Sequence, residues 1–267
     1  MKTGPEPYEP FLKGLVQRGI TPVLVAGQAV NYWAERYAER NEKLREKAPF
    51  TSGDMEIYRT SIPREYAKSL PAGELYENDP FAKALPADSA TCYFDWDGNS
   101  MVVQVMRHLE GLSEAEVEKR SVPAKIGNVP IKVLDPLALC QAKTANLLKI
   151  KQAGRQDLRH LEISILCSGE FISDVLDKDG PRAALNLVKR MKEIALSKGA
   201  TEVRKTDLVD WSPAIPWSAI EARRETETLI ARFLDSDAPR WRKLLAPPLP
   251  MGSNPPGATS GGNLPEI

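Results

Sequence analysis

Cysteine and histidine are scarce in this chain of 267 residues. The three cysteines, Cys92, Cys140 and Cys167, are odd in number and form no Cys-x-x-Cys pair. That pattern argues against a disulfide framework and against a cysteine-based zinc site. The two histidines, His108 and His160, are too few and too far apart in the sequence to suggest zinc ligation. We therefore expect buried thiols in a reducing compartment.

The chain also lacks an excess of either charge and a long apolar run. Basic and acidic residues number 36 each, so the formal net charge is zero. No global field for nucleic acid is expected, and any polyanion site must be a local patch. No charged-then-apolar leader opens the sequence, and no apolar run approaches the ~18 residues of a membrane span. These absences predict a soluble cytoplasmic protein with no membrane partner.

Apolar residues make up 42% of the chain, enough to bury the core of one large or two modest domains. Up to residue 134, β-rich runs alternate with amphipathic stretches, and from residue 135 the pattern is helical throughout. This order predicts an α/β (α+β) fold, with a mixed sheet flanked by helices in residues 1–134 and a helical domain in residues 135–245. Residues 246–267 are rich in Pro, Gly, Ser and Asn, and we expect them to be disordered.

Hydrophobic period and turn chemistry set the predicted elements. The Asp-Gly-Asn turn at 97–99 predicts a hairpin, Ser113 with Glu116 predicts a capping box, and the Asp-Pro pair at 135–136 predicts a helix start. Pro130 argues that its strand lies at a sheet edge. The predicted strands cover residues 20–26, 55–58, 90–96, 100–106, 124–126 and 129–134. The predicted helices cover residues 11–16, 28–45, 63–70, 112–120, 137–151, 156–167, 169–176, 182–197 and 218–234, with residues 71–90 as loop.

A glycine turn joins the first apolar run to the helix that follows it. Residues 20–26 are dominated by Val, Ile and Leu, and the helix begins at Gly27 and Gln28. A glycine at such a turn lets backbone amides approach a phosphate closely, and a helix N-terminus favours negative charge. A purely steric role for Gly27 stays open, because many turns between strand and helix carry glycine for packing alone.

Two carboxylates, Asp54 and Glu56, follow this helix among apolar neighbours. Their spacing of two places both on the same side of a strand, where they repel each other unless a cation compensates them. Carboxylate pairs of this kind bind Mg²⁺, and a metal pair can stabilise the attacking and leaving oxygens of phosphoryl or nucleotidyl transfer. The alternative is an edge strand that shows its acidic face to water, in a protein where the pair is merely surface.

In this order the motifs resemble the nucleotidyltransferase fold of polymerase β-like enzymes, with a closer likeness to AbiEii-like toxins and related small nucleotidyltransferases. The likeness covers residues 11–167. The family pattern is a glycine turn, a helix, a strand with Asp-x-Asp or Asp-x-Glu, and a third carboxylate on a later strand. The segments that carry the resemblance are Val25-Ala-Gly-Gln-Ala29, Thr51-Ser-Gly-Asp-Met-Glu56, Asp135-Pro-Leu137, Lys143-Thr-Ala-Asn146 and Arg155-Gln-Asp-Leu-Arg-His160.

The resemblance implies a role for each matched residue. Gly27, Gln28 and Ser52 would hold the triphosphate of an NTP, and Asp54 and Glu56 would hold Mg²⁺, with two ions possible.

Two residues of the later segments would complete the site. By the same resemblance, Lys143 would neutralise phosphate charge in catalysis, and Asp157 would support the nucleotide site or orient a basic group. Each has an ordinary alternative: Lys143 as a solvated helix lysine, and Asp157 as a local cap before Leu158.

One position departs from the family pattern. The third carboxylate belongs on the strand at residues 101–106, and the matching residue is Gln104. A neutral amide cannot act as a general base and is a weak metal ligand beside a carboxylate. Asp95 on the partner strand could substitute only if the register placed it on the same face. The departure leaves two interpretations: a slow enzyme, or a binding protein that has lost catalysis.

The sequence therefore predicts a metal-dependent nucleotidyltransferase that moves an NMP from an NTP to an acceptor hydroxyl on an RNA end, a protein or a small molecule. The resemblance implies that it could belong to a toxin–antitoxin pair with a protein partner. The alternative is a catalytically impaired binding or regulatory protein of the same fold. Basic residues could contact RNA phosphates, or could be solvated helix faces. They fall into two groups: Lys143, Lys149, Lys151, Arg155 and Arg159, and Arg182, Lys189, Arg190 and Lys192.

Overall fold

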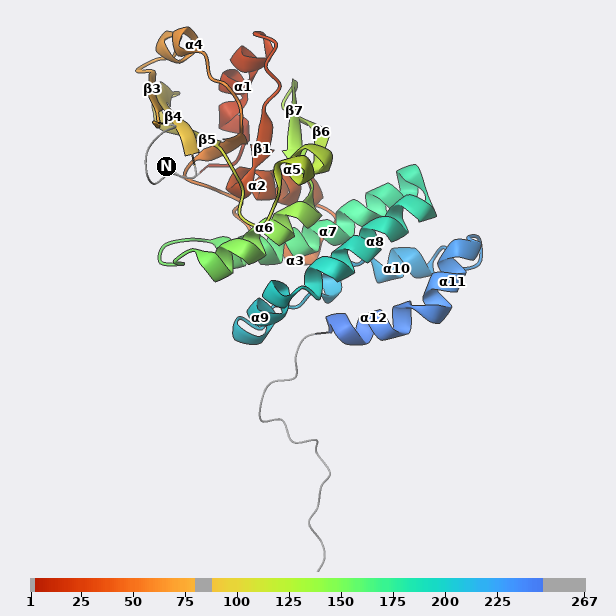
Figure 1. Cartoon of the computed structure of the whole chain (residues 1–267). Coiled ribbons are helices and arrows are strands. Elements are labelled where there is room, and N and C mark those ends of the chain that lie inside the picture. Colours follow the sequence, from red (N-terminus) through yellow and green to blue (C-terminus); the bar gives the residue numbers. More distant parts are fainter. Residues whose placement is uncertain (1–2, 80–87, 247–267) are drawn as a thin grey trace, which may run out of the picture.

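A computed structural model describes residues 3–79 and 88–246 of the chain. It has an N-terminal part built around one sheet and a C-terminal part made of helices, and α6 and α7 run between the two (Figure 1). The fold class is mixed α and β, as predicted. The tail predicted to be disordered lies, from residue 247 on, outside the described residues. No helix of the described part has both the length and the apolar character needed to cross a bilayer.

The sheet has seven strands in the order β3-β4-β5-β2-β1-β7-β6. It is mixed, because β1 with β7 and β2 with β5 pair in parallel while the other neighbours are antiparallel. The first strand and the carboxylate strand therefore lie side by side at its centre. The strands are β1 (Val23–Val25), β2 (Met55–Tyr58), β3 (Glu74–Glu77), β4 (Asp88–Trp96), β5 (Asn99–Met106), β6 (Ser121–Ile126) and β7 (Val129–Leu134).

Local turn and cap chemistry behaves as predicted. Asp97 and Gly98 both have positive φ (48° and 72°), which is the requirement of the two-residue hairpin turn between β4 and β5. Ser113 and Glu116 form the capping box of α5 (Glu114–Arg120). The Asp135 side chain accepts the Ala138 N–H and caps α6 (Pro136–Lys149).

Two predictions about the sheet are wrong. Residues 71–90 are not all loop, because β3 pairs with β4 along its whole length. The hairpin strand β7 is not an edge, because it lies between β1 and β6. Pro130 is tolerated there because β1 pairs only with Lys132 and Val133, so its missing N–H faces no strand on that side.

The remaining helices build the rest of the molecule. On the N-terminal side they are η1 (Glu6–Tyr8), α1 (Glu9–Val16), α2 (Ala26–Ala38), α3 (Glu42–Arg45) and α4 (Arg64–Ser69). On the C-terminal side they are α7 (Asp157–Asp179), α8 (Pro181–Ala195), α9 (Lys198–Thr206), η2 (Ser212–Ala214), α10 (Trp217–Glu221), α11 (Thr228–Ser236) and α12 (Ala238–Leu245).

Several helix boundaries differ from the predicted ones. The two helices predicted at 156–167 and 169–176 are one helix, α7 (Asp157–Asp179), and Gly169 does not interrupt it. The helix predicted at 28–45 is two, α2 and α3, and the one at 218–234 is divided between α10 and α11. Gly199 lies inside α9, and α12 is an additional helix. Where a predicted helix is divided or two are joined, the apolar spacing was recognised but a short connecting turn, or its absence, was not. The helices at residues 198–206 and 238–245 were not predicted.

Two hydrophobic clusters meet along α6 and α7. The first contains the sheet, α1 and α2, together with Ala138, Leu139, Ile163, Leu166 and Cys167. The second begins at Leu137 and extends to Leu245. The three cysteines are free and buried among these residues, as predicted. Because α6 and α7 contribute residues to each cluster and pack against α2, they connect the two clusters.

Gly169 and Gly199 provide a matched pair of helix glycines for a test of packing. A Cβ on Gly169 would overlap the carbonyl oxygen of Pro213, which is backbone and cannot move aside. A Cβ on Gly199 would meet the flexible tip of Leu148. We expect Gly169→Ala to lower the free energy of unfolding by about 1–3 kcal/mol, and Gly199→Ala to leave it unchanged or raise it by up to ~1 kcal/mol. Urea denaturation measures both, and equal effects would contradict the packing assignment.

Candidate functional site

The carboxylate of Glu56 faces the N-terminus of α2. Its Oε2 accepts a hydrogen bond of 3.0 Å from the backbone N–H of Gly27. The strand that carries it, β2, lies between β1 and β5, so the alternative of a solvent-facing edge strand is wrong. A protein carboxylate thus satisfies one of the free N–H groups of the helix start, where the sequence predicted that a phosphate would bind.

Gly27 is also required by close packing. A Cβ at this position would lie 2.9 Å from the Ser52 hydroxyl and 3.4 Å from Cε1 of His160. The preceding Ala26 turns the chain into the helix with a φ of 51°. The steric role left open for Gly27 is therefore real, and it exists together with the hydrogen bond that its N–H donates to Glu56.

The side chain of Gln28 is already bonded within the protein. It is 0% exposed, donates to the Thr3 carbonyl at 3.0 Å and accepts from Asn31 at 3.1 Å. The predicted contact of the Gln28 side chain with a triphosphate does not fit this arrangement. Only its backbone N–H, in the first turn of α2, stays in a position to face an anion.

Ser52 connects the N-terminal segment to Asp54. Its backbone exchanges two hydrogen bonds of 2.9 Å with Thr3, and its hydroxyl donates to Asp54 Oδ1 at 3.3 Å. Asp54 lies in the bend just before β2. Burial, and then the charge of Asp54, raises the pKa of Tyr8 to about 12. Tyr8 therefore also lies near this carboxylate, which its sequence position alone did not indicate.

Asp157 gathers three donors at the start of α7. Lys143 donates to its Oδ1 at 2.9 Å and Asn146 to the same oxygen at 3.2 Å, while Arg155 donates to Oδ2 at 2.6 Å. Lys143 is only 4% exposed and Asp157 only 2%, so the alternative of a solvated helix lysine is wrong. Asp157 fixes two cations in place and is more than a local cap.

The charges of these groups act on one another across the site. Burial raises the pKa of Glu56; the Lys143 charge opposes that shift and the Asp54 charge adds to it. Burial alone would also raise the pKa of Asp157, but Lys143 and the hydrogen bond from Arg155 hold it well below its usual range. Lys143 therefore acts on both carboxylates. It is paired with Asp157, and among the neighbouring charges it has the largest effect on the pKa of Glu56.

Gln104, the residue matched to the third carboxylate by the resemblance, lies beside the carboxylate strand. In the parallel pairing of β2 with β5 it lies directly opposite Glu56, so both side chains leave the sheet on the same face. Asp95 is on that face too, because Thr91 pairs with Gln104 and Asp95 with Ser100. It lies four residues along the strand, however, roughly 13 Å away. Asp95 cannot replace the missing carboxylate.

The donor set fits a hard divalent cation. Asp54 and Glu56 supply carboxylate oxygens, and Gln104 supplies an amide oxygen beside Glu56. Mg²⁺ commonly binds proteins through one or two carboxylates and takes its other ligands from water and substrate phosphates. The described residues contain no cluster of three or more His, Cys, Asp or Glu side chains. Two carboxylates in mutual repulsion are nevertheless sufficient for such an ion.

His160 is a site residue that sequence reasoning did not single out. It lies one turn after Asp157 on α7, is 5% exposed and packs beside Gly27. Its Nε2 is buried and has no hydrogen-bond partner within the described part of the chain. The sequence signal that could have found it is a spacing of three residues, which places Asp157 and His160 on one face of a helix. The same spacing places Lys143 and Asn146 on one face of α6.

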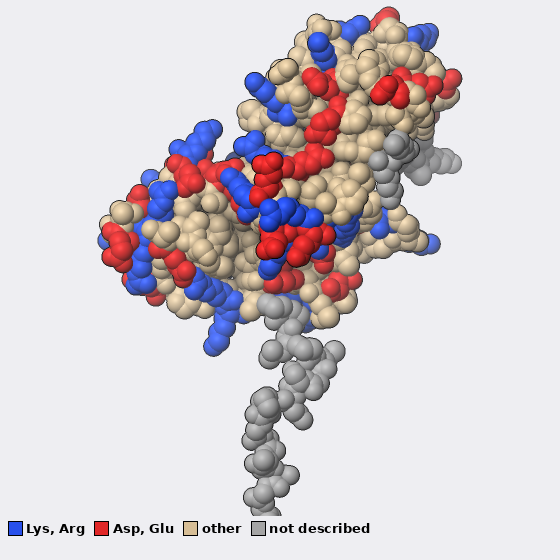
Figure 2. Space-filling view, turned by 180° about the vertical axis from the view of Figure 1, so that it is seen from behind, with Lys and Arg blue, Asp and Glu red and all other residues tan. Residues whose placement is uncertain are grey.

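Many of the basic residues considered for RNA contact are paired within the protein. Lys149 bonds Glu110 at 2.7 Å, Arg190 bonds Asp135 at 2.9 Å, and Arg159 donates to the Pro49 carbonyl. Figure 2 shows acidic and basic side chains intermixed over one face of the molecule, without a broad basic field. A polyanion that approached this face would therefore meet separate cations with acidic side chains between them.

Comparison with known protein families found no family that matches the chain, and comparison with curated proteins found no match either. The geometry of the site is therefore the basis for any functional conclusion.

The charges of the site predict different effects of two isosteric substitutions on the free energy of unfolding, one at Asp157 and one at Asp54. Asp157→Asn leaves the buried Lys143 ammonium without a counter-charge, and we expect the free energy of unfolding to fall by about 3 kcal/mol or more. Asp54→Asn removes repulsion with Glu56, so we expect no loss or a small gain, within about 1 kcal/mol. Urea titration of both variants is the measurement. A loss at position 54 as large as that at 157 would contradict this charge arrangement.

His160 predicts a pH dependence of stability. Burial, followed by the charge of Lys143, lowers the pKa of His160 to about 3, with Arg155 and Arg159 acting in the same direction and Asp157 opposing. Because the unfolded chain binds this proton more readily, His160 costs stability as the pH falls below about 6.5. Between about pH 7 and pH 4.5 the cost is on the order of 2 kcal/mol.

The His160→Gln variant isolates this contribution. It should lose about 2 kcal/mol less stability than the parent over the same pH interval, measured by urea denaturation at each pH. Other groups, such as Glu35 with its pKa raised to about 8, contribute equally to both proteins and cancel in the comparison. Parallel pH profiles for the two proteins would show that His160 titrates normally.

Proposed function

We propose that this protein is a Mg²⁺-dependent nucleotidyltransferase that transfers an NMP from an NTP to an acceptor hydroxyl. The observation that carries the proposal is the convergence of two charged groups of opposite sign on the N-terminus of α2. Glu56 approaches it from β2 and Asp54 from the bend just before β2. Lys143 approaches it from α6, held by Asp157, which also holds Arg155 in the segment before α7. A nucleotide triphosphate bound with a divalent cation needs both kinds of group.

Each residue has a defined role in this proposal. Asp54 and Glu56 would hold Mg²⁺, which when bound neutralises the phosphate oxygens and the developing charge on the leaving group. Lys143 and Arg155 add positive charge on the opposite side, in orientations that Asp157 fixes. The N–H groups at the start of α2 face the phosphates.

In the reaction itself the acceptor hydroxyl oxygen forms a bond to the α-phosphorus. The bond from the α-phosphorus to the oxygen bridging the β-phosphate breaks, and pyrophosphate leaves. The hydroxyl proton passes to solvent water, because Gln104 stands where a carboxylate base is found in the related pattern and an amide does not accept it. Positioning and charge neutralisation therefore supply most of the rate enhancement, and turnover is slow.

Gln104 also favours a second candidate function. A protein that keeps the nucleotide pocket but lacks the base opposite Glu56 could bind nucleotide as a signal and regulate a partner, including a partner of the antitoxin kind. This candidate predicts nucleotide binding without product.

Incubation with labelled NTPs and Mg²⁺, with and without total RNA or a lysate, tests the proposal. We expect a labelled product and a loss of about 100-fold or more in Asp54→Ala, because a group that stabilises the transition state is removed. Asp95→Ala is the matched control: it removes a carboxylate from the same sheet face about 13 Å away, and it should keep full activity. Comparing RNA, protein and small-molecule fractions identifies the acceptor.

Gln104→Asp is the complementary variant. It restores a carboxylate opposite Glu56, and we expect product formation to rise by up to about 100-fold. Nucleotide binding without product in the parent, together with no gain in Gln104→Asp, would favour the regulatory candidate. Labelling and binding that are both unchanged in Asp54→Ala would refute the site.

A further inference from the structure

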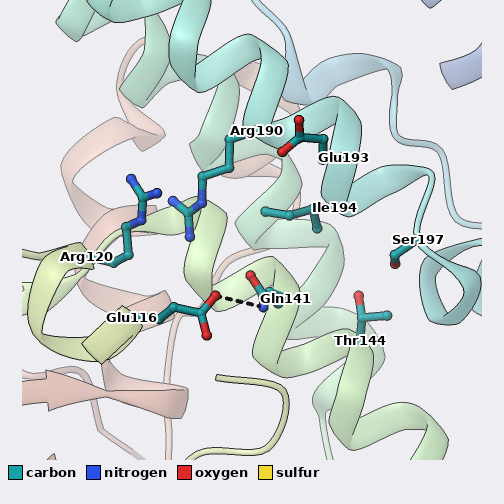
Figure 3. Close-up of a pocket in the computed structure, with 8 residues that line it drawn as sticks. All are labelled: Glu116, Arg120, Gln141, Thr144, Arg190, Glu193, Ile194 and Ser197. Carbon is teal, nitrogen blue, oxygen red and sulfur yellow. Dashed lines mark hydrogen bonds between the residues drawn. The ribbon is translucent and has the colours of Figure 1, made fainter. Parts of the chain in front are cut away.

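A cavity apart from the Asp54/Glu56 site lies where the α/β part meets the helical part. It has a volume of about 350 Å³ and lies between α5, α6 and the end of α8 (Figure 3). Eight residues line it: Glu116 and Arg120 from α5, Gln141 and Thr144 from α6, and Arg190, Glu193, Ile194 and Ser197 from α8 and the turn after it. None of them belongs to the Asp54/Glu56 site.

One side chain that lines this cavity has an unsatisfied hydrogen-bond donor. Arg190 binds Asp135 through Nη1, at 3.2 and 2.9 Å, while its Nη2 is buried and has no partner within the described residues. A buried donor without an acceptor costs free energy that a ligand oxygen would recover. Arg120 lies close by: burial and then the Arg190 charge lower its pKa, while the charges of Asp135 and Glu116 oppose that shift. Two guanidinium groups are thus held together facing one space.

The acidic residues of the cavity are not equivalent. Glu116 is already bonded to the backbone and hydroxyl of Ser113, at 2.8 and 2.7 Å, and lies 3.5 Å from the Gln141 amide. Glu193 is exposed at the rim, and in the described structure neither it nor Arg120 forms an ion pair. Among the described residues, Arg190 therefore keeps one free donor beside its ion pair with Asp135, Arg120 has no ion pair of its own, and Glu193 is an unpaired carboxylate at the mouth.

From this arrangement we propose that the cavity binds a small zwitterion of the α-amino-acid type. Its carboxylate accepts from Arg190 Nη2 and from Arg120, whose planar guanidinium groups match a planar carboxylate. Its ammonium group points outward to Glu193, and Ile194 gives an apolar wall for a side chain. A phosphate dianion is disfavoured, because Glu193 and Glu116 repel the additional charge.

Isothermal titration calorimetry on the full chain tests the proposal with alanine, valine and leucine at millimolar concentrations. Leucinamide, which lacks the carboxylate, and N-acetyl-leucine, which lacks the ammonium group, are the matched ligands, with inorganic phosphate as the competing class. We expect at least one of the three amino acids to bind, and both altered ligands and phosphate to bind about tenfold or more weakly.

Two variants locate the binding. Arg120→Gln should weaken amino-acid binding about tenfold or more. Glu193→Gln should weaken it roughly threefold or more while leaving N-acetyl-leucine unaffected. Lys189→Gln removes an exposed cation of α8 that does not line the cavity, and it should change nothing. Arg190 is left intact because it holds Asp135, which caps α6.

No binding of any amino acid, equal binding of leucine and its two altered forms, or unchanged affinity in both cavity variants would each overturn the proposal. Tighter binding of phosphate than of the amino acids would overturn the ligand class. Glu193 is exposed, so its substitution reports on the cavity even if Arg120→Gln fails to fold.

Discussion

The buried pair of Lys143 and Asp157 is the interaction on which the rest of the site depends. It joins α6 to the start of α7 and orients Arg155. It also places a positive charge opposite Glu56 on the central strand. A pair of this kind contributes little net stability over an apolar substitute, yet either partner alone is strongly unfavourable in the interior. The presence of this pair where two hydrophobic clusters meet is therefore better explained by the effect of its charges on the site than by a contribution to stability.

Much of this arrangement could be predicted from the sequence, because local chemistry determined it. Gly27, Asp54 and Glu56 carry their geometry in short motifs, and the hairpin turn at residues 97–99 and the cap at Asp135 are set by the residues themselves. The register that places Gln104 opposite Glu56 also agrees with the predicted position. These features depend on neighbours in the chain or on one strand pairing.

The features that could not be predicted depend on contacts between distant segments. Gln28 is enclosed by Thr3 and Asn31 rather than by a ligand, and Pro130 is accommodated because β1 is too short to reach it. Gly169 was predicted to begin a separate helix, but it lies inside α7, where it allows the close approach of the Pro213 backbone. His160 looks like an isolated histidine until α7 packs against the start of α2. In all four cases the partner is supplied by tertiary structure, which composition and periodicity do not encode.

The hydrogen bond from Gly27 to Glu56 has a kinetic consequence. The carboxylate already occupies the helix start, so an incoming phosphate must compete with a group of the same charge that is tethered in place. A cation that draws Glu56 toward itself removes that competitor and frees the N–H. Under the proposed function, binding is then ordered, with the metal entering before or with the nucleotide. Under the same proposal, the metal-free protein would hold off free phosphates with the side chain of Glu56.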